Sequence, residues 1–356
     1  MRVIIKIGSS SLLEECKIDK LMEVISKASV DNELILVTSG AILFGMKKLG
    51  LINRPIDMNV KQACAAIGQV KLIEEYEKAA NKYNILIAQI LLNHDDFDSR
   101  KRLLNFKNTL NKLLSLKVIP IINENDALAV EEIKLGDNDT LAALLVPVVD
   151  ASLVILFSDI DGLYDKDPNK YSNALLINKV EEINKDIEQM AGCSSVFGTG
   201  GMYTKIRAAK ISTCAKCDLV IANSNEIDNL INIIKGDKIG TIFKATKTKT
   251  NNKLHWLIYS ANSKGIIKVD EGAKYALLNR KSLLSKGIIS VTGDFVTGSV
   301  VDIYFNTKLG KGIVNYSSDE IKLILGKNSS EISKILGYKD KDEVIHANDI
   351  VLEGSK

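Results

Sequence analysis

The chain has 356 residues, of which 46% are hydrophobic and 26% charged, and its formal net charge is +3. This length predicts about two domains with a sizeable core. The near-neutral charge gives no global case for binding nucleic acid or a membrane surface, and no apolar run is long enough for a membrane span. Five cysteines, an odd number, indicate a reducing compartment, so we expect a cytoplasmic protein. We expect no secretory leader, because the N-terminus enters a strand-like run directly.

From the N-terminus, short apolar runs rich in β-branched residues alternate with segments of helical spacing. Strands are expected at 2–7, 33–37, 85–92, 117–122, 152–157 and 218–222. Helices are expected at 18–28, 42–49, 61–83, 99–116, 140–148 and 203–214. Strands and helices that alternate at this spacing predict an α/β fold, an αβα sandwich with a mostly parallel central sheet.

The composition and periodicity of the sequence change after residue 245. We expect a first domain at 1–245 and a linker at 246–264, which is polar, basic and without periodicity. Beyond it, short strands separated by glycines are expected at 288–291, 299–305 and 311–316. They predict a small β-rich C-terminal domain at 265–356.

An acidic cluster separates two very apolar runs in the first domain. It comprises the segments 122–126 (INEND) and 136–140 (GDNDT), between the apolar runs 113–122 and 141–149. Parallel sheets place ligands at the carboxyl ends of their strands. We therefore interpret this cluster as the floor of an active site.

Two glycine-rich turns, each beside a lysine, are candidate phosphate sites. Lys6 ends the first strand just before Gly8-Ser9-Ser10-Ser11, where small residues let backbone N–H groups approach an anion. Gly198-Thr199-Gly200-Gly201 opens a helix that carries Lys205 in its first turn. The alternatives are an ordinary lysine before a turn and a flexible loop with a solvated lysine. Two lysines, two such turns and clustered carboxylates indicate phosphoryl transfer, which depends on positioning and charge neutralisation.

Several motifs, in this order, resemble the amino acid kinase family. They lie at 3–10, 37–41, 122–127, 136–139, 158–164 and 198–205. The segments 265–273, 286–288 and 291–295 look like the PUA domain that some members of the family carry. Each motif is weak alone, but their order is specific, and the resemblance covers essentially the whole chain.

The resemblance implies ATP-dependent phosphorylation of the side-chain carboxylate of L-glutamate to L-glutamyl 5-phosphate, the first step of proline biosynthesis. It implies Mg²⁺ on the ATP phosphates, and we assign no protein ligand to that metal. The implied catalytic residues are Lys6, Asp139 and Lys205, with Asp139 orienting both lysines. The implied glutamate-binding residues are Ser39, Gly40, Asp126, Asp137 and Asn138. The implied ATP-binding residues are Lys6, Gly8, Ser9, Ser158, Asp159, Thr199, Gly200, Gly201, Met202, Tyr203, Thr204 and Lys205.

The resemblance also implies inhibition by proline and a homo-oligomer, either a dimer or a tetramer. The next enzyme of the proline pathway is a candidate partner. One alternative is a sister kinase that acts on N-acetylglutamate or another carboxylate. A second alternative is a protein that binds RNA through the PUA-like domain. We expect neither nucleic acid nor a membrane as a partner, however.

Overall fold

The computed structural model describes residues 1–12, 17–128, 137–190, 201–246, 262–339 and 341–352. The chain divides into two compact units, Met1–Lys249 and Thr250–Lys356. The expected linker at 246–264 lies mostly outside the described residues. None of the described helices combines the length and apolarity needed to cross a membrane.

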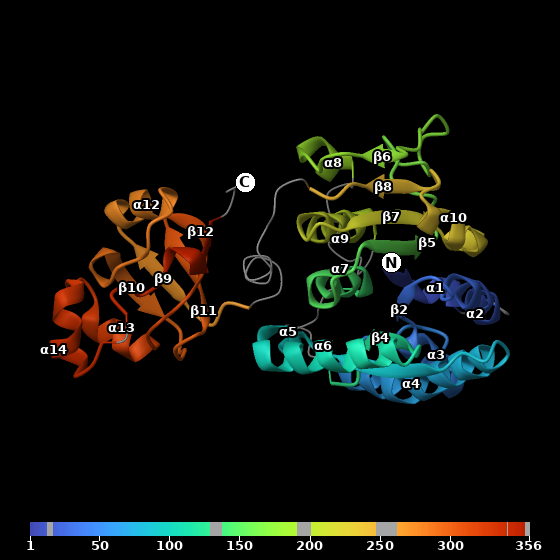
Figure 1. The fold of residues 1–356 in the computed structure, drawn as a ribbon, viewed down its shortest axis with the longest axis horizontal. Helices are drawn as coiled ribbons and strands as arrows, with labels where there is room; N and C mark the ends of the chain where they lie inside the picture. The colour runs from blue at the N-terminus through green and yellow to red at the C-terminus, as the bar shows by residue number, and fades with distance from the viewer. Residues whose placement is uncertain (13–16, 129–136, 191–200, 247–261, 340, 353–356) are drawn as a thin grey trace. The chain divides into compact units, whose positions relative to one another are not determined.

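The first unit is built on an eight-stranded sheet with the order β3-β4-β2-β1-β5-β7-β8-β6 (Figure 1). Its strands are β1 (Arg2–Ile7), β2 (Glu33–Val37), β3 (Ile87–Leu92), β4 (Ile119–Glu124), β5 (Leu153–Ser158), β6 (Lys179–Val180), β7 (Asp218–Asn223) and β8 (Thr241–Phe243). Neighbouring strands pair in parallel, except that β7 and β8 are antiparallel. The prediction of a mostly parallel sheet is confirmed.

Helices cover both faces of this sheet (Figure 1). One layer contains α2 (Lys17–Ala28), α3 (Ala41–Leu49), α4 (Met58–Asn81) and α10 (Leu230–Lys235). The other layer contains α5 (His94–Asp98), α6 (Arg100–Ser115), α7 (Asn138–Val149) and α9 (Met202–Cys214). Shorter elements are α1 (Ser9–Leu12), α8 (Lys185–Met190) and the 3₁₀ helix η2 (Ser224–Asn229). The αβα sandwich is thus confirmed.

The side chains of β1 point alternately to the two faces of the sheet. Val3, Ile5 and Ile7 pack into one apolar core with residues of α2 and α4. Because successive side chains of a strand point to opposite faces, Lys6 points to the other side, where α7 and α9 lie. A lysine in a buried strand is thereby aimed at the first turns of two helices.

The second unit holds a five-stranded sheet with the order β10-β9-β11-β12-β13. Its strands are β9 (Ile266–Val269), β10 (Ile288–Thr292), β11 (Val300–Phe305), β12 (Thr307–Ile313) and β13 (Ile350–Leu352). Its helices are α12 (Glu271–Leu278), α13 (Ser318–Ile324) and α14 (Ile332–Leu336), with 3₁₀ turns at Ser285–Gly287, Ser329–Glu331 and Ala347–Asp349. The apolar core of this unit includes Ile267, Val301, Ile303 and Ile321.

The structure departs from the sequence expectations mainly in the second unit. The strand expected at 311–316 lies earlier, at Thr307–Ile313, because the hairpin with β11 sets its register. The helices α12 and α13 were not expected, although each has a capping signal in the sequence. The Asp270 side chain accepts from Ala273 N–H, and Ser317 and Glu320 form a capping box.

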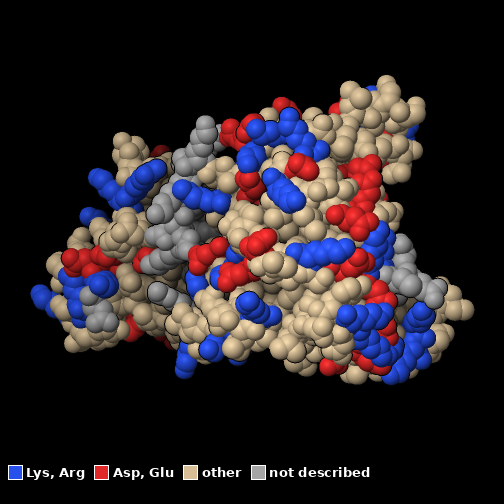
Figure 2. Space-filling view, turned by 45° about the vertical axis from the view of Figure 1, so that its right-hand side comes forward, with Lys and Arg blue, Asp and Glu red and all other residues tan. Residues whose placement is uncertain are grey.

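Basic and acidic side chains are interspersed over the face in Figure 2, among the residues that the structure describes. This distribution agrees with the small net charge of +3.

The antiparallel pair α3 and α4 approaches too closely for side chains at two points. A Cβ on Gly68 would lie 1.8 Å from Ala41 O, and one on Gly45 would lie 1.9 Å from Cys64 O. Only glycine permits this approach. The contact holds the N-terminus of α3, which begins directly after Gly40, against the middle of α4.

Gly68→Ala is expected to destabilise the chain by about 2 kcal/mol, because its methyl group meets backbone rather than a movable side chain. The matched control is Gly272→Ala in α12, where the added Cβ meets only Asp270 Oδ1 at 3.5 Å. Alanine favours helix there, so stability should be unchanged or slightly higher. Thermal unfolding followed by circular dichroism measures both, and equal melting temperatures would contradict the packing argument.

Candidate active site

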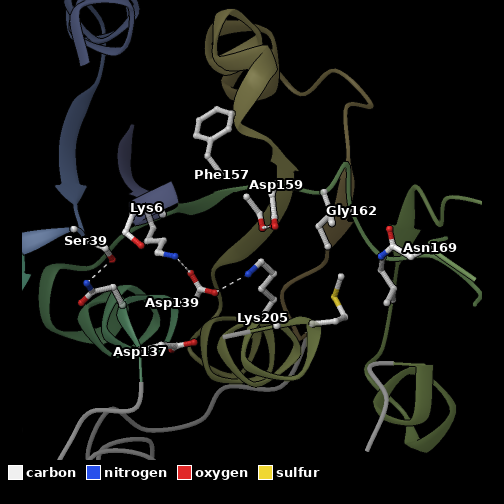
Figure 3. Close-up of a pocket in the computed structure, with 18 of the residues that line it drawn as sticks. Lys6, Ser39, Asp137, Asp139, Phe157, Asp159, Gly162, Asn169 and Lys205 are labelled. Carbon is white, nitrogen blue, oxygen red and sulfur yellow. Dashed lines mark hydrogen bonds and ion pairs between the residues drawn. The ribbon is translucent and has the colours of Figure 1, made fainter. Parts of the chain in front are cut away.

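A cavity of about 750 Å³ opens at the carboxyl edge of the parallel sheet (Figure 3). Its walls come from the ends of β1, β2, β4 and β5 and from the first turns of α7 and α9. The expected site residues that line it are Lys6, Gly8, Ser9, Ser39, Gly40, Asp126, Asp137, Asn138, Asp139, Ser158, Asp159, Gly201, Met202 and Lys205. The fold therefore brings together motifs that are far apart in the chain.

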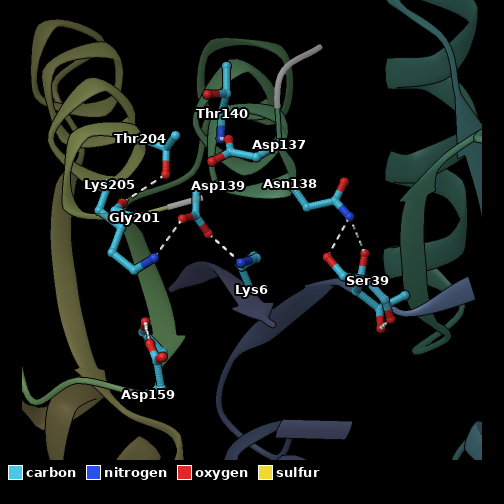
Figure 4. A network of polar contacts seen from close by, with 12 residues as sticks. Lys6, Ser39, Asp137, Asn138, Asp139, Thr140, Asp159, Gly201, Thr204 and Lys205 are labelled. Atoms are coloured by element: carbon cyan, nitrogen blue, oxygen red, sulfur yellow. Dashed lines mark hydrogen bonds and ion pairs between the residues drawn. The ribbon is translucent and has the colours of Figure 1, made fainter. Parts of the chain in front are cut away.

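Asp139 lies between two lysines at the centre of this cavity (Figure 4). Lys6 Nζ is 2.5 Å from Asp139 Oδ1, and Lys205 Nζ is 3.1 Å from Asp139 Oδ2. All three residues are buried, with exposed fractions of 8%, 2% and 8% for Lys6, Asp139 and Lys205. One carboxylate thus holds two cationic side chains from β1 and α9.

The charge state of Asp139 follows from two opposing effects. Burial disfavours the carboxylate, but the charges of Lys6 and Lys205 and their hydrogen bonds outweigh it. The pKa of the Asp139 carboxyl therefore lies below its ordinary value. The ionised carboxylate neutralises one of the two lysine charges, which leaves one positive charge for an anion in the cavity.

The side of the cavity toward β2 presents acceptor oxygens. Asn138 Nδ2 donates to Thr38 O at 2.8 Å and to Ser39 Oγ at 2.6 Å, whereas Asn138 Oδ1 is buried without a hydrogen-bond partner among the described residues. Asp137 Oδ1 accepts from Thr140 N–H at 2.8 Å and caps α7, while its Oδ2 is also buried without a partner in the described part of the chain. Buried acceptors without partners are costly unless a ligand completes them. A cationic donor such as an ammonium group suits both.

The opposite end of the cavity is formed by the segment that follows β5 (Figure 3). Ser158 Oγ donates to Asp159 Oδ1 at 2.9 Å. Further lining residues there, which the sequence analysis missed, are Gly162, Leu163, Tyr164, Lys166, Asp167, Pro168, Asn169, Lys170 and Met190. The motif at 158–164 extended into this segment and could have signalled it.

A small network beside this segment shapes the turn that follows β5. Asp161 accepts hydrogen bonds from Asn223 Nδ2 at 2.7 Å and from Tyr164 OH at 2.8 Å. These two bonds lower the pKa of the Asp161 carboxyl. The turn between β5 and the lining segment is thereby tied to the end of β7.

Some expected nucleotide-binding residues do not line the cavity. The Tyr203 side chain is 54% exposed, and Thr204 Oγ1 donates to Gly201 O at 2.9 Å within the first turn of α9. Thr199 and Gly200 lie outside the described residues. Arg54, between α3 and α4, lines the cavity but was not expected.

A mostly parallel α/β sheet with two buried lysines on one carboxylate at its carboxyl edge suits an enzyme of phosphoryl transfer. The model of the amino acid kinase family matches residues 1–223, and the PUA domain model matches residues 265–336. The chain belongs to the amino acid kinase family and carries a C-terminal PUA domain.

Curated relatives match along nearly the whole chain. The glutamate 5-kinase of Caldanaerobacter subterraneus subsp. tengcongensis is 47% identical, over 99% of this chain and 98% of that protein. The glutamate 5-kinase of Carboxydothermus hydrogenoformans is 46% identical, over 99% of this chain and 97% of that protein. A solved structure, the UMP kinase from Ureaplasma parvum, aligns at 19% identity with a TM-score of 0.48, over 68% of this chain and 98% of that one.

Asp139→Asn is expected to lower the free energy of unfolding at pH 7 by about 3 kcal/mol, because it leaves two buried lysine charges uncompensated. The folded-state pKa of Asp139 is depressed, so its stabilisation is present above the unfolded-state value of about 3.9 and is lost as the pH falls through the folded-state pKa. Urea titrations from pH 7 to pH 3 should show the difference between the two proteins shrinking below about pH 4.

The control is Asp319→Asn, which removes an exposed partner of Lys322 at 2.9 Å. Its effect should stay within about 0.5 kcal/mol at every pH. A stability difference for Asp139→Asn that grows toward acid pH would contradict the assigned charge state.

Proposed function

We propose that this chain transfers the γ-phosphoryl group of ATP to the side-chain carboxylate of L-glutamate. The product is L-glutamyl 5-phosphate, the first intermediate of proline biosynthesis. The observation that carries the proposal is the buried Lys6–Asp139–Lys205 arrangement, which lies in one cavity with the acceptor oxygens on the β2 side and the segment after β5. Full-length similarity to glutamate 5-kinases at up to 47% identity supports the same substrate.

The chemistry needs charge stabilisation rather than a general base. A glutamate side chain, with a pKa of about 4.3, is already an ionised nucleophile at neutral pH. During transfer, negative charge spreads over the oxygens of the phosphoryl group. The ammonium groups of Lys6 and Lys205 face that charge, and Asp139 holds both in place before the reaction.

The acceptor oxygens on the β2 side select for a free α-ammonium group. Asp137 Oδ2 and Asn138 Oδ1 are buried without partners among the residues that the structure describes, and Asp126 lines the same cavity. Charge-assisted hydrogen bonds to an ammonium group are stronger than those to a neutral amide. N-acetylglutamate carries an uncharged amide nitrogen at this position, so we expect it to bind less well.

ATP would lie at the end of the cavity formed by Ser158, Asp159 and the segment after β5. Its phosphates would lie at Gly8 and Ser9 and at the N-terminus of α9. Mg²⁺ would accompany the phosphates with much of its water shell, since it gives up water reluctantly. The carboxylate of Asp159 supplies an oxygen suited to such a hydrated ion. Bound Mg²⁺ would neutralise charge on the β- and γ-phosphates.

Regulation and assembly belong to the same proposal. Proline has the ammonium group and α-carboxylate of glutamate, so it would compete for the same acceptors.

Exposed apolar side chains lie in the connection between α3 and α4, at Leu49, Leu51, Ile52 and Ile56, and support a dimer or tetramer. The next enzyme of the proline pathway is a proposed partner, because acyl phosphates hydrolyse readily. Among the described residues, Cys64 and Cys217 are buried free thiols, which supports a cytoplasmic location.

A hydroxamate-trapping assay with ATP and Mg²⁺ tests the substrate directly. We expect the acyl phosphate to form from L-glutamate and much less from N-acetylglutamate or aspartate. Added proline should raise the apparent KM for glutamate and leave kcat unchanged. Turnover of N-acetylglutamate without turnover of glutamate would overturn the proposal.

Lys205→Ala and Lys6→Ala are each expected to lower kcat by at least about 100-fold, because each removes a charge aimed at the transferred group. KM for glutamate should change little, because the α-ammonium contacts remain. The matched control is Lys210→Ala on the same helix, whose exposed side chain pairs with Glu188 at 2.6 Å. Normal turnover by Lys205→Ala would contradict the role given to this lysine.

A further inference from the structure

Behind the glutamate side of the cavity, Gln69 of α4 contacts the end of β4. Asn123 Nδ2 donates to Gln69 Oε1 at 2.9 Å, and Asn123 is only 1% exposed. Neither residue lines the cavity. Asn123 Oδ1, however, accepts from Asn138 Nδ2 at 3.0 Å. A chain of side-chain amides therefore runs from α4, through β4, to the substrate pocket.

The direction of each amide in this chain is set by its neighbours, because an amide side chain has a donor end and an acceptor end. Asn138 Nδ2 is surrounded by three acceptors, Thr38 O, Ser39 Oγ and Asn123 Oδ1 (Figure 4 shows Ser39). The acceptor end, Oδ1, has no partner among the described residues, so it is the end available to a donor of the substrate.

The orientation of the Asn123 amide is fixed by hydrogen bonds at both its oxygen and its nitrogen. Glu124 N–H donates to Asn123 Oδ1 at 2.9 Å, and Gln69 Oε1 accepts from Asn123 Nδ2. If the acceptor at Gln69 were lost, a buried donor would have no partner, and the Asn123 amide would be held only at its Oδ1 end. Any shift of that amide displaces the Oδ1 that receives Asn138 Nδ2.

Helix α4 is anchored on both sides of Gln69. Gly68 lies at the close approach to Ala41 O, so the helix cannot withdraw without breaking that packing. Two turns later, Tyr76 OH and Thr38 Oγ1 form a hydrogen bond of 2.9 Å in which both residues are fully buried. The Gln69 acceptor is thus held at a fixed place relative to the ends of β2 and β4.

We propose that Gln69 is a positioning residue for the amino acid substrate. It orients Asn123, and Asn123 orients Asn138 so that Asn138 Oδ1 faces the α-ammonium group of glutamate. The inference rests on the proposed function. It assigns to α4 a role in substrate affinity, separate from the phosphoryl-transfer step at Lys6 and Lys205.

The test variant is Gln69→Met, which keeps the length of the side chain and removes the acceptor. KM for glutamate should rise about tenfold, the factor expected from one misplaced hydrogen bond, whereas kcat and KM for ATP stay within about twofold. The matched control is Gln89→Met on the edge strand β3, where the residue is exposed. That substitution should change none of the three constants.

A double-mutant cycle separates positioning from a general effect on the fold. Asn138→Ala alone should raise KM for glutamate, and adding Gln69→Met to it should have no further effect. Additive effects, or an unchanged KM in Gln69→Met, would overturn the inference while the proposed function stands. A wild-type chain that does not phosphorylate glutamate would overturn both.

Gln69→Glu gives a second readout if Gln69→Met does not fold. It keeps an acceptor oxygen toward Asn123, and Gln69 Nε2 makes no hydrogen bond to any described residue that would be lost. If KM for glutamate stays within about threefold of the wild-type value, the inference is supported, because the hydrogen bond from Asn123 Nδ2 is then kept. A tenfold or larger rise overturns it.

Discussion

One buried carboxylate shared by two lysines is the interaction on which this active site depends. Lys6, Asp139 and Lys205 come from β1, α7 and α9, so their contact joins three elements at the carboxyl edge of the sheet. Two lysines buried side by side would repel each other, and burial would disfavour each charge. Asp139 pairs with both lysines and neutralises one of their two positive charges. It also lies in the first turn of α7, where the helix dipole favours a negative charge.

Three consecutive side chains at the start of α7 make different contacts. Asp137 is the extended residue that caps the helix, and Asn138 and Asp139, the first two helical residues, are rotated by about 100° from each other. Asp137 caps the helix and lines the cavity, Asn138 donates to the residues that follow β2, and Asp139 pairs with the lysines. In the proposed function, this helix terminus separates amino acid recognition from phosphoryl transfer within one cavity.

The two ends of the cavity are supported differently. The amino acid side rests on α3 and α4, whose close approach at Gly45 and Gly68 leaves little room for movement. The other end is built from turns after β5, tied to β7 through Asp161 and Asn223. Amino acid discrimination needs fixed hydrogen-bond directions, since a misdirected amide presents a donor where an acceptor is needed. A rigid helix pair suits that requirement.

The sequence alone determined the alternation of strands and helices, the acidic cluster and the two lysines beside glycine-rich turns, because periodicity and turn chemistry are local. The ordered motifs indicated the family. Only the tertiary structure decided that Lys6 faces α7 and α9, that the segment after β5 lines the cavity, and that Gln69 lies behind Asn123. In the second unit it also decided the register of β12, which pairing with β11 sets. These features depend on contacts between residues far apart in the chain, and no local pattern specifies which distant residue becomes a neighbour.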